Sequence, residues 1–408
     1  MRHLRIGHFL AHFPELDGTT TMLIGLSEGL IHVGHTVYAY GFGGRRTVTA
    51  APAAADEAPD RIDQAGINVR VFRAATHLRA PFLSNSKGLT SRLAANRDRL
   101  DLMVIHGAFG IFSPQVARAC QRAHIPAIAC PHDPYSPELF GPHRTVKAAY
   151  WRLIEAPYLQ GMAGIHLLAP SHMQHLRNRG IRVPAFVVPD GLDAAFFDSG
   201  KSSASDQGPS VDADELKVLY FGRWDIYNKG LDLLLRAMAE EGRTGATRLE
   251  VAGKGSEEER RTLLGLIDSL GLRERVSLVG FVPDIQRAIR SVEAVILPSR
   301  FDGFGQVVLE SLVLGTPVIL SSRAGASEYL GEEHGVLAMD PDVPGIATAL
   351  KQAARSRNRL RRAARSARQY LEREFSWQVL AERWMEEVDR VIAERASSRS
   401  SWFFRSQS

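Results

Sequence analysis

The chain has 408 residues, of which 45% are hydrophobic and 23% charged, proportions that are ordinary for a soluble globular protein and exclude a disordered or fibrous one. At roughly 150 residues per domain, this length predicts two or three domains, and we favour two. The formal net charge of +5 is compatible with an acidic membrane surface as a partner, but no recognisable nucleic-acid-binding motif accompanies the basic residues.

Cys120 and Cys130 are the two cysteines of the chain. Their spacing is not that of metal ligands, and no histidine partner is arranged around them, so we predict neither a disulfide framework nor a metal site. The start of the sequence has too short an apolar run for a signal peptide, and no segment approaches about 18 uninterrupted apolar residues. We therefore expect a cytoplasmic protein whose contact with a membrane, if any, is peripheral.

Short apolar runs alternate with helical patterns through residues 1–197. This alternation is typical of a parallel sheet with helices on both faces, so we predict one doubly wound α/β domain here. A small, polar segment at 44–60 predicts a mobile insertion. The expected strands are "LRIGHFL", "HTVYAYGF", "LDLMVIH", "IPAIACPH", "GIHLLAP" and "AFVVPDG", and the helix "MLIGLSEGLIHVG" lies between the first two.

A polar segment at 198–215 predicts a linker, after which the alternation restarts and predicts a second doubly wound domain at 216–375. A capping box from Ser256 to Glu259 predicts a helix start. We expect a C-terminal helix at 376–397 that packs back toward the first domain, followed by a frayed tail at 398–408. The expected strands of the second domain are "LKVLYFGR", "TRLEVAGKG", "RVSLVGFV", "EAVILPS" and "TPVILSS".

An arginine-rich run occupies residues 351–374. A helical apolar stripe lies beneath the arginines, which favours a solvated helix face over an acidic membrane surface as the explanation of the charge. The stripe consists of Leu360, Ala364, Ala367 and Leu371.

Two doubly wound sheets that face one another form a cleft at the carboxyl ends of their strands, and ligands bind at such ends. Arg223 ends the first strand of the second domain, and Lys229 stands just before the helix that begins near Gly230. Two cations near a helix N-terminus with its free N–H groups suit a diphosphate. Ordinary solvated loop charges would explain the pair equally well.

The segment "SRFDGFGQVVLE" at 299–310 places Asp302 on a loop and Glu310 on the following helix. Gly303 and Gly305 allow the backbone to approach a ligand closely, although turn geometry alone would also explain them. Glu310 has apolar neighbours at helical spacing, and a carboxylate there needs hydrogen-bond donors. A ligand's hydroxyl groups or an internal partner could supply them.

Several segments together carry a resemblance to a known family. "GRWDIYNKGLDLLL", "VAGKGSEEE", "VSLVGFVPD" and "PSRFDGFGQVVLESLVLGTPVI" resemble the second domain of the family-four retaining glycosyltransferases, which have the two-Rossmann GT-B fold. The start of the chain, "PHDPYSPELF" and "VVPDGLD" are similar to segments of that family's first domain. The resemblance covers about residues 1–390, and the combination of motifs makes it specific.

The resemblance implies roles for residues of the second domain. Arg223 and Lys229 match the pair that holds the diphosphate of a nucleotide-sugar and stabilises it as a leaving group. Glu310 matches the second acid of the E-x7-E motif, which accepts hydrogen bonds from the ribose. Asp302 occupies the first acid's position near the transferred sugar, where the family normally has Glu. The backbone around Phe304 and Gly305 would meet sugar hydroxyls.

The resemblance also implies roles in the first domain. His132 matches a histidine near the sugar and the acceptor, with a locally satisfied strand-end histidine as the alternative, and for His106 that alternative is favoured. Gly18 lies at the first strand-to-helix loop, where the family usually has a glycine pair beside the phosphates. Asp190 replaces the family's usual Asn in "PNG", and the spacing from Arg223 to Lys229 is one residue longer than the commonest form.

The implied activity is transfer of a sugar, a hexose as we expect, from a nucleoside-diphosphate sugar to a hydroxyl of a glycan or lipid-linked acceptor. The family implies retention of configuration, and we expect neither a metal nor a cofactor beyond the co-substrate. Envelope or secreted polysaccharide synthesis is the expected setting. A binding protein of the same fold that has lost activity is the alternative, because Asp302 departs from the motif. A sugar phosphorylase is disfavoured, since no pyridoxal-phosphate lysine segment is recognisable.

Overall fold

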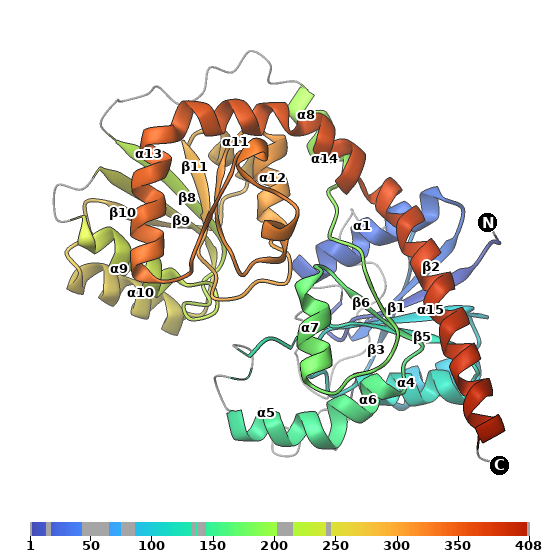
Figure 1. Cartoon of the computed structure of the whole chain (residues 1–408). Helices are drawn as coiled ribbons and strands as arrows, with labels where there is room; N and C mark the ends of the chain where they lie inside the picture. Colours follow the sequence, from blue (N-terminus) through green and yellow to red (C-terminus); the bar gives the residue numbers. More distant parts are fainter. Residues whose placement is uncertain are drawn as a thin grey trace. The chain divides into compact units, whose positions relative to one another are not determined.

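The computed structural model describes residues 2–13, 18–42, 65–74, 86–132, 135–137, 140, 144–201, 215–241 and 246–405 (Figure 1). The chain divides into two compact units, an N-terminal unit of Met1–Gly191 with Trp377–Ser408 and a C-terminal unit of Leu192–Ser376. The predicted insertion at 44–60, most of the predicted linker at 198–215 and the last residues of the tail lie outside the described residues.

The N-terminal unit contains a seven-stranded sheet of order β3-β2-β1-β4-β5-β6-β7, in which every neighbouring pair is parallel. Six strands coincide with the apolar runs of the sequence, and β3 was not predicted because its side chains are mostly half-buried and its sequence lacks a strong apolar run. The strands are β1 Arg5–Phe9, β2 Thr36–Phe42, β3 Asn68–Phe72, β4 Leu102–His106, β5 Ala127–Cys130, β6 Gly164–Leu167 and β7 Ala185–Val187.

Helices follow most strands of this unit, as a doubly wound sheet requires. The last helix of the chain, α15, packs on α1, where Gly25 and Gly29 make room for it. A Cβ on Gly25 would lie 1.9 Å from the Trp377 indole nitrogen, so no larger residue fits there. The helices are α1 Gly18–His32, α3 Lys87–Ala94, α4 Ser113–Arg122, α5 Arg144–Tyr150, the π-helix η4 Trp151–Glu155, α6 Ala156–Gln160, α7 Ser171–Asn178 and α15 Trp377–Arg405.

The C-terminal unit contains a six-stranded sheet of order β10-β9-β8-β11-β12-β13, again with parallel pairs throughout. The strand β13 was not predicted, although it has four residues, as several of the predicted strands do. The strands are β8 Leu216–Arg223, β9 Thr247–Lys254, β10 Val276–Gly280, β11 Ala294–Leu297, β12 Val318–Ser321 and β13 Val336–Met339.

Helices of the C-terminal unit surround this sheet (Figure 1). The capping box that opens α10 is confirmed, with Ser256 and Glu259 each bonded to the other's backbone N–H. The helices are α8 Ala194–Lys201, α9 Leu231–Glu240, α10 Glu257–Ser269, α11 Ile285–Arg290, α12 Val307–Val313, the 3₁₀ turns η5 Gly325–Glu328 and η6 Glu332–His334, α13 Val343–Ser366 and α14 Arg368–Phe375. Both units are therefore the predicted parallel α/β domains.

The arginine-rich run forms most of α13 and nearly all of α14. Its apolar stripe is buried as predicted: Leu360, Ala364, Ala367 and Leu371 are at most 4% exposed. Several of the arginines bind their own unit. Arg359 pairs with Glu332, and Arg361 donates to the Val292 carbonyl at 2.6 Å. Among the described helices, none has the length and apolar character that crossing a membrane requires.

Candidate functional site

Lys229 and Asp302, predicted from distant parts of the sequence, form an ion pair in the C-terminal unit. The Lys229 ammonium lies 2.6 Å from Asp302 Oδ2, and the side chains are 21% and 14% exposed. The Ser299 hydroxyl also donates to Asp302 Oδ2, at 3.3 Å. Lys229 lies between β8 and α9, and Asp302 lies between β11 and α12. Because β8 and β11 are neighbours, their carboxyl ends bring the cation and the acid together.

Gly230 allows these two segments to meet. It has a φ of 68°, in the left-handed region, and a Cβ there would lie 2.0 Å from the Pro298 carbonyl oxygen. Arg300 fixes the same approach, because its guanidinium donates to both Asp232 carboxylate oxygens, at 2.7 and 2.8 Å, and to the Tyr227 carbonyl at 2.6 Å. A two-pronged bond of this kind restricts geometry as well as contributing energy.

The loop after Asp302 is fixed by backbone bonds to the segment after β12. The Asp302 carbonyl accepts from the Gly325 amide at 3.1 Å, and the Phe304 carbonyl accepts from the Ala326 amide at 3.0 Å. The Phe304 side chain is buried, and Gly305 has a φ of 92°. The Phe304 ring faces the core, and the role implied for the backbone of this stretch stays a prediction.

Arg223 is exposed at the end of β8, beside a cation that the sequence analysis did not single out. It is in register with Lys254 of β9, whose Nζ lies 4.3 Å from the centre of the Phe281 ring. The strands approach closely here, since a Cβ on Gly253 would lie 1.8 Å from the Gly222 carbonyl oxygen. This edge of the sheet therefore carries two adjacent cations.

The amides at the start of α9 are less available than expected. Those of residues 229–231 already donate to backbone carbonyls of residues 225–227. A diphosphate at this edge would therefore meet the side chains of Arg223 and Lys229 before it met these N–H groups.

Glu310 lies in α12 and is half-buried, as is Val307 on the same side of the helix. The fully buried residues of α12 are Val308, Leu309, Ser311, Leu312 and Val313. The cost that we expected for removing the Glu310 carboxylate from water is therefore smaller than at a buried position. Its ribose-binding role stays a prediction.

In the N-terminal unit, the two histidines considered in the sequence analysis are hydrogen-bonded to each other. His106 Nδ1 lies 2.9 Å from His132 Nε2, and His106 Nε2 lies 2.9 Å from Nδ1 of a third histidine, His8 of β1. Because β1, β4 and β5 are neighbours, the three rings form a row. His106 is buried within the row, and His132 lies half-buried at its end. Gly18 is the exposed first residue of α1, and its role beside the phosphates stays a prediction.

Glu155 secures the loops on either side of His132. It is fully buried in the π-helix, and its Oε1 accepts from the Phe109 amide at 2.9 Å and the Tyr135 hydroxyl at 2.6 Å. Phe109, His132 and Tyr135 have φ values of 55°, 60° and 59°, which non-glycine residues adopt rarely. Burial raises the pKa of Glu155. Single π-helical turns are frequent at functional sites, and this one places the acid between the two loops.

Cys130 has a histidine partner, contrary to our expectation. Its Sγ lies 3.4 Å from His166 Nδ1, while His166 Nε2 donates to the Val188 carbonyl at 2.8 Å. Trp384 of α15 also donates to His166 Nδ1, at 3.3 Å. Burial, and then the charge of Asp190, hold the pKa of the Cys130 thiol well above its ordinary value. Spacing could not indicate this contact, because the partners come from adjacent strands 36 residues apart.

His106, Cys130 and His132 place possible metal-binding atoms within 4.8 Å of one another. The two histidine nitrogens are hydrogen-bonded to each other, however, and the thiol is protonated and held by His166. A cation would have to replace both arrangements, since a metal binds the deprotonated thiolate. These atoms are therefore better suited to hydrogen bonding, and the expected lack of a metal stays a prediction.

Four residues of these sites were not predicted from the sequence: His8, His166, Lys254 and Glu155. Each of the first three lies at or near the carboxyl end of a buried parallel strand, the position where functional residues were sought. Comparing these positions across all predicted strands would have found them. Glu155 gave no such signal, because it lies inside a helical pattern.

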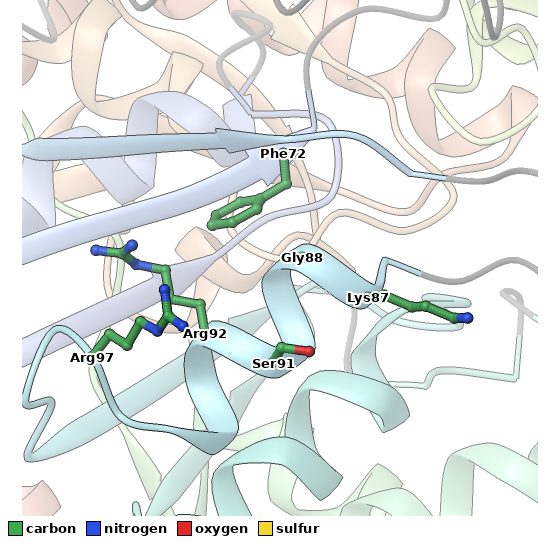
Figure 2. A pocket seen from close by; sticks show the side chains of 6 residues that line it. All are labelled: Phe72, Lys87, Gly88, Ser91, Arg92 and Arg97. Carbon is green, nitrogen blue, oxygen red and sulfur yellow. The ribbon is translucent and has the colours of Figure 1, made fainter.

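A hollow of about 460 Å³ lies elsewhere in the N-terminal unit. Figure 2 shows Phe72 on the sheet side, the other residues on α3 and the turn after it, and Lys87 pointing away from Arg92 and Arg97. Arg92 already pairs with Asp98, at 2.5 Å, and the Tyr40 hydroxyl donates to the same carboxylate at 2.8 Å. This hollow includes none of the residues predicted from the sequence.

Comparison with known proteins follows the same division into two units. The family model "Glycosyl transferases group 1" matches residues 203–370, and "Glycosyl transferase 4-like domain" matches residues 17–191. The chain belongs to the group 1 glycosyltransferases. Its fold is GT-B: it aligns with Anabaena HepE at a TM-score of 0.71, covering 95% of this chain and all of HepE at 18% identity. Sucrose-phosphate synthase of Thermosynechococcus elongatus gives 0.73, with 96% and 100% covered at 19% identity.

Curated relatives of this group 1 glycosyltransferase match over shorter segments. Glycogen synthase of Mycobacterium tuberculosis is 30% identical over 202 residues, which are 48% of this chain and 46% of the relative. LpsE of Rhizobium meliloti, a lipopolysaccharide core biosynthesis glycosyltransferase, is 28% identical over 193 residues, 47% of this chain and 55% of the relative. The chain thus spans about half the length of these relatives.

Proposed function

We propose that this chain transfers a hexosyl group from a nucleoside-diphosphate sugar to a hydroxyl of a glycan or lipid-linked acceptor, with retention of configuration and without a metal ion. The observation that carries the proposal is the meeting of Lys229 and Asp302 at the carboxyl ends of β8 and β11, near Arg223 at the end of β8. In a group 1 glycosyltransferase, this is where a diphosphate and its attached sugar would need a cation and a hydrogen-bond acceptor.

Each predicted residue of the C-terminal unit would contact a different part of the donor. Arg223 and Lys229 would bind the diphosphate and stabilise its charge as it leaves, an effect on the order of a few kcal/mol. Asp302 would orient the ammonium and accept a bond from a sugar hydroxyl, and Glu310 would accept from the ribose. The Phe304 and Gly305 backbone would meet other sugar hydroxyls.

The N-terminal unit would contribute His132 to the sugar and the acceptor, and Gly18 would allow close approach to the phosphates. In the reaction, the bond from the anomeric carbon to the diphosphate breaks, and a bond to the acceptor oxygen forms on the same face. The acceptor's proton passes to the departing diphosphate, so no protein base is required.

A screen of nucleotide-sugars tests the proposal. UDP-glucose is the first donor to try, because HepE has been crystallised with UDP and glucose and with UDP-glucose. Binding should raise the unfolding temperature, and the best binder should release its nucleoside diphosphate when an acceptor is added, with or without a chelator. No shift with any nucleotide-sugar would contradict the proposal, and loss of activity with chelator would contradict its metal independence.

Binding without turnover would favour the alternative, a nucleotide-sugar-binding protein of the same fold. The observation that favours it is that Asp302, the shorter replacement for the motif's Glu, is already engaged by Lys229. Turnover at rates typical of enzymes, about 1 per second or faster, would exclude it.

The proposed setting is envelope or secreted polysaccharide synthesis at an acidic membrane surface. The name of LpsE supports this setting by analogy alone. Exposed arginines of α13, among them Arg355, Arg362 and Arg365, would supply the contact. Sedimentation with vesicles containing phosphatidylglycerol tests it, and equal recovery with neutral vesicles would contradict an electrostatic contact.

A further inference from the structure

The row of imidazoles formed by His8, His106 and His132 has a geometry that favours hydrogen bonds. Both N–N distances are 2.9 Å, both pairs of ring centres lie 5.2 Å apart, and the paired ring planes are within 22° of each other. The distance between centres is about the N–N distance plus two ring radii, so the nitrogens lie near the line that joins the centres. The rings are therefore side by side, with each nitrogen pointing at its neighbour.

The first two rings of the row are neutral. Burial lowers the pKa of His8 to about 3 and that of His106 well below its ordinary value. The groups whose charges act on His106 are other histidines, and each lowers its pKa further: His132, His8, His166 and His12. A neutral imidazole has one N–H and one lone pair, so the donors of the row must all point in one direction.

The far end of the row determines that direction. His8 Nε2 is buried and has no hydrogen-bond partner among the described residues. If His132 donated to His106 and His106 to His8, this nitrogen would carry a buried N–H without an acceptor. Buried backbone N–H groups are left unpaired more rarely than buried backbone acceptors are, and we take the same preference to hold for an imidazole. His8 and His106 therefore both donate from Nδ1, toward His132.

We propose that His8 and His106 are positioning residues that fix His132 as a neutral imidazole protonated on Nδ1, so that His132 does not act as a general base. Its Nε2 lone pair accepts the bond from His106 and is used within the row. The consequence for the reaction rests on the proposed function.

Two further observations agree with this assignment. His132 has a left-handed backbone, with a φ of 60°, and such backbone outliers cluster at functional sites. His8 Nε2, at the other end of the row, has no hydrogen-bond partner among the described residues that could take up or supply a proton. The row is therefore suited to fixing a tautomer and not to conducting protons.

Histidine tautomers in solution test the proposal without any substrate. The full chain, labelled with ¹⁵N-histidine, is studied by long-range ¹H–¹⁵N correlation between pH 5 and 8, with signals assigned through His8→Asn, His106→Asn and His132→Asn. At pH 7 to 8, His132 should show the neutral Nδ1–H pattern. In His106→Leu, it should become a mixture of tautomers. His32→Leu, at an exposed residue of α1, should leave the His132 signal unchanged.

Three results would overturn the proposal. They are an Nε2–H tautomer at His132, a charged imidazolium there at pH 7, or one equivalent of bound zinc that is lost in His106→Asn. The last would show that these nitrogens bind a metal instead of each other.

Kinetics give a second, separate measurement. With the donor found in the screen, His106→Leu should lower kcat about 10- to 100-fold through a misplaced ring, with donor affinity unchanged. His106→Asn should recover most of the loss, since its amide can still donate to His132 Nε2. Equal losses in the two variants would contradict the positioning role. If no donor binds at all, the proposed function fails, while the tautomer measurement still decides the state of His132.

Discussion

The C-terminal unit presents ions at its strand ends, with Lys229 paired to Asp302 and Arg223 beside Lys254, whereas the N-terminal unit presents neutral imidazoles. Of the chain's 14 histidines, His334 is the single one within residues 192–376. Partly exposed ions can exchange their partner for an anionic ligand, but a buried neutral row cannot change its charge at neutral pH. On the proposed function, the comparison therefore favours the C-terminal unit as the place where the anionic part of a donor binds.

Removing a cation of the C-terminal unit should have the largest effect. Lys229→Ala should lower kcat about 100- to 1,000-fold, because the leaving diphosphate loses a preorganised positive charge. Release of nucleoside diphosphate measures this, with circular dichroism to confirm the fold. Lys217→Ala is the matched control, since Lys217 is an exposed lysine at the other end of β8. Wild-type activity in the Lys229 variant would remove the basis of the diphosphate assignment.

At acid pH, the N-terminal unit should lose stability before the C-terminal unit does. Burial lowers the pKa of His8 and of His172 to about 3 and that of His166 to about 4, while the unfolded chain binds protons near pH 6.5. The stability that these rings contribute is complete above pH 6.5 and falls as the pH drops toward 4, by roughly 1 kcal/mol per pH unit for each ring. Glu155, whose pKa burial raises, acts in the opposite sense.

Hydrogen exchange read by mass spectrometry between pH 7 and 4.5, corrected for the intrinsic rates, resolves the units. The N-terminal unit should open first. His32→Asn, at an exposed position, should not shift the transition. Earlier opening of the C-terminal unit would show that the buried rings do not control acid stability.

Glu310→Ala should weaken nucleotide binding about 10-fold, because a hydrogen bond to a charged acceptor contributes about 1.5–3 kcal/mol. Calorimetry with the nucleoside diphosphate measures it. Glu328→Ala, at an exposed acid of the same unit, is the control. Unchanged affinity in Glu310→Ala would exclude the ribose role.

The smallest effect is expected from Asp302→Asn. This substitution should raise the affinity for a nucleoside diphosphate but lower the turnover of the complete donor. Loss of the carboxylate charge releases Lys229 from its partner, so a nucleoside diphosphate should bind a few-fold more tightly. Turnover of the complete donor should fall, since the sugar loses an acceptor. Weaker diphosphate binding would indicate that Asp302 is needed to position the ammonium.

Much of the fold could be predicted because parallel strands buried on both faces appear as apolar runs, as in "LKVLYFGR" and "EAVILPS". The half-buried β3 lacks that signal, whereas β13 was missed although its apolar run is as long as that of β11. The C-terminal residues could be predicted from the motif resemblance, and neighbouring strands bring Lys229 and Asp302 together. The histidine row could not, because it depends on the order β1-β4-β5, which places side chains 98 and 26 residues apart in contact.

The packing of α15 on α1 has a consequence for biosynthesis. Trp377 fills the space above Gly25, yet it leaves the ribosome after the whole of residues 192–376. While the second unit is synthesised and folds as a domain of its own, the first unit therefore lacks α15, and the glycine-lined face of α1 stays uncovered. A translation stall before Trp377 would release an N-terminal unit exposed to aggregation next to a finished C-terminal one.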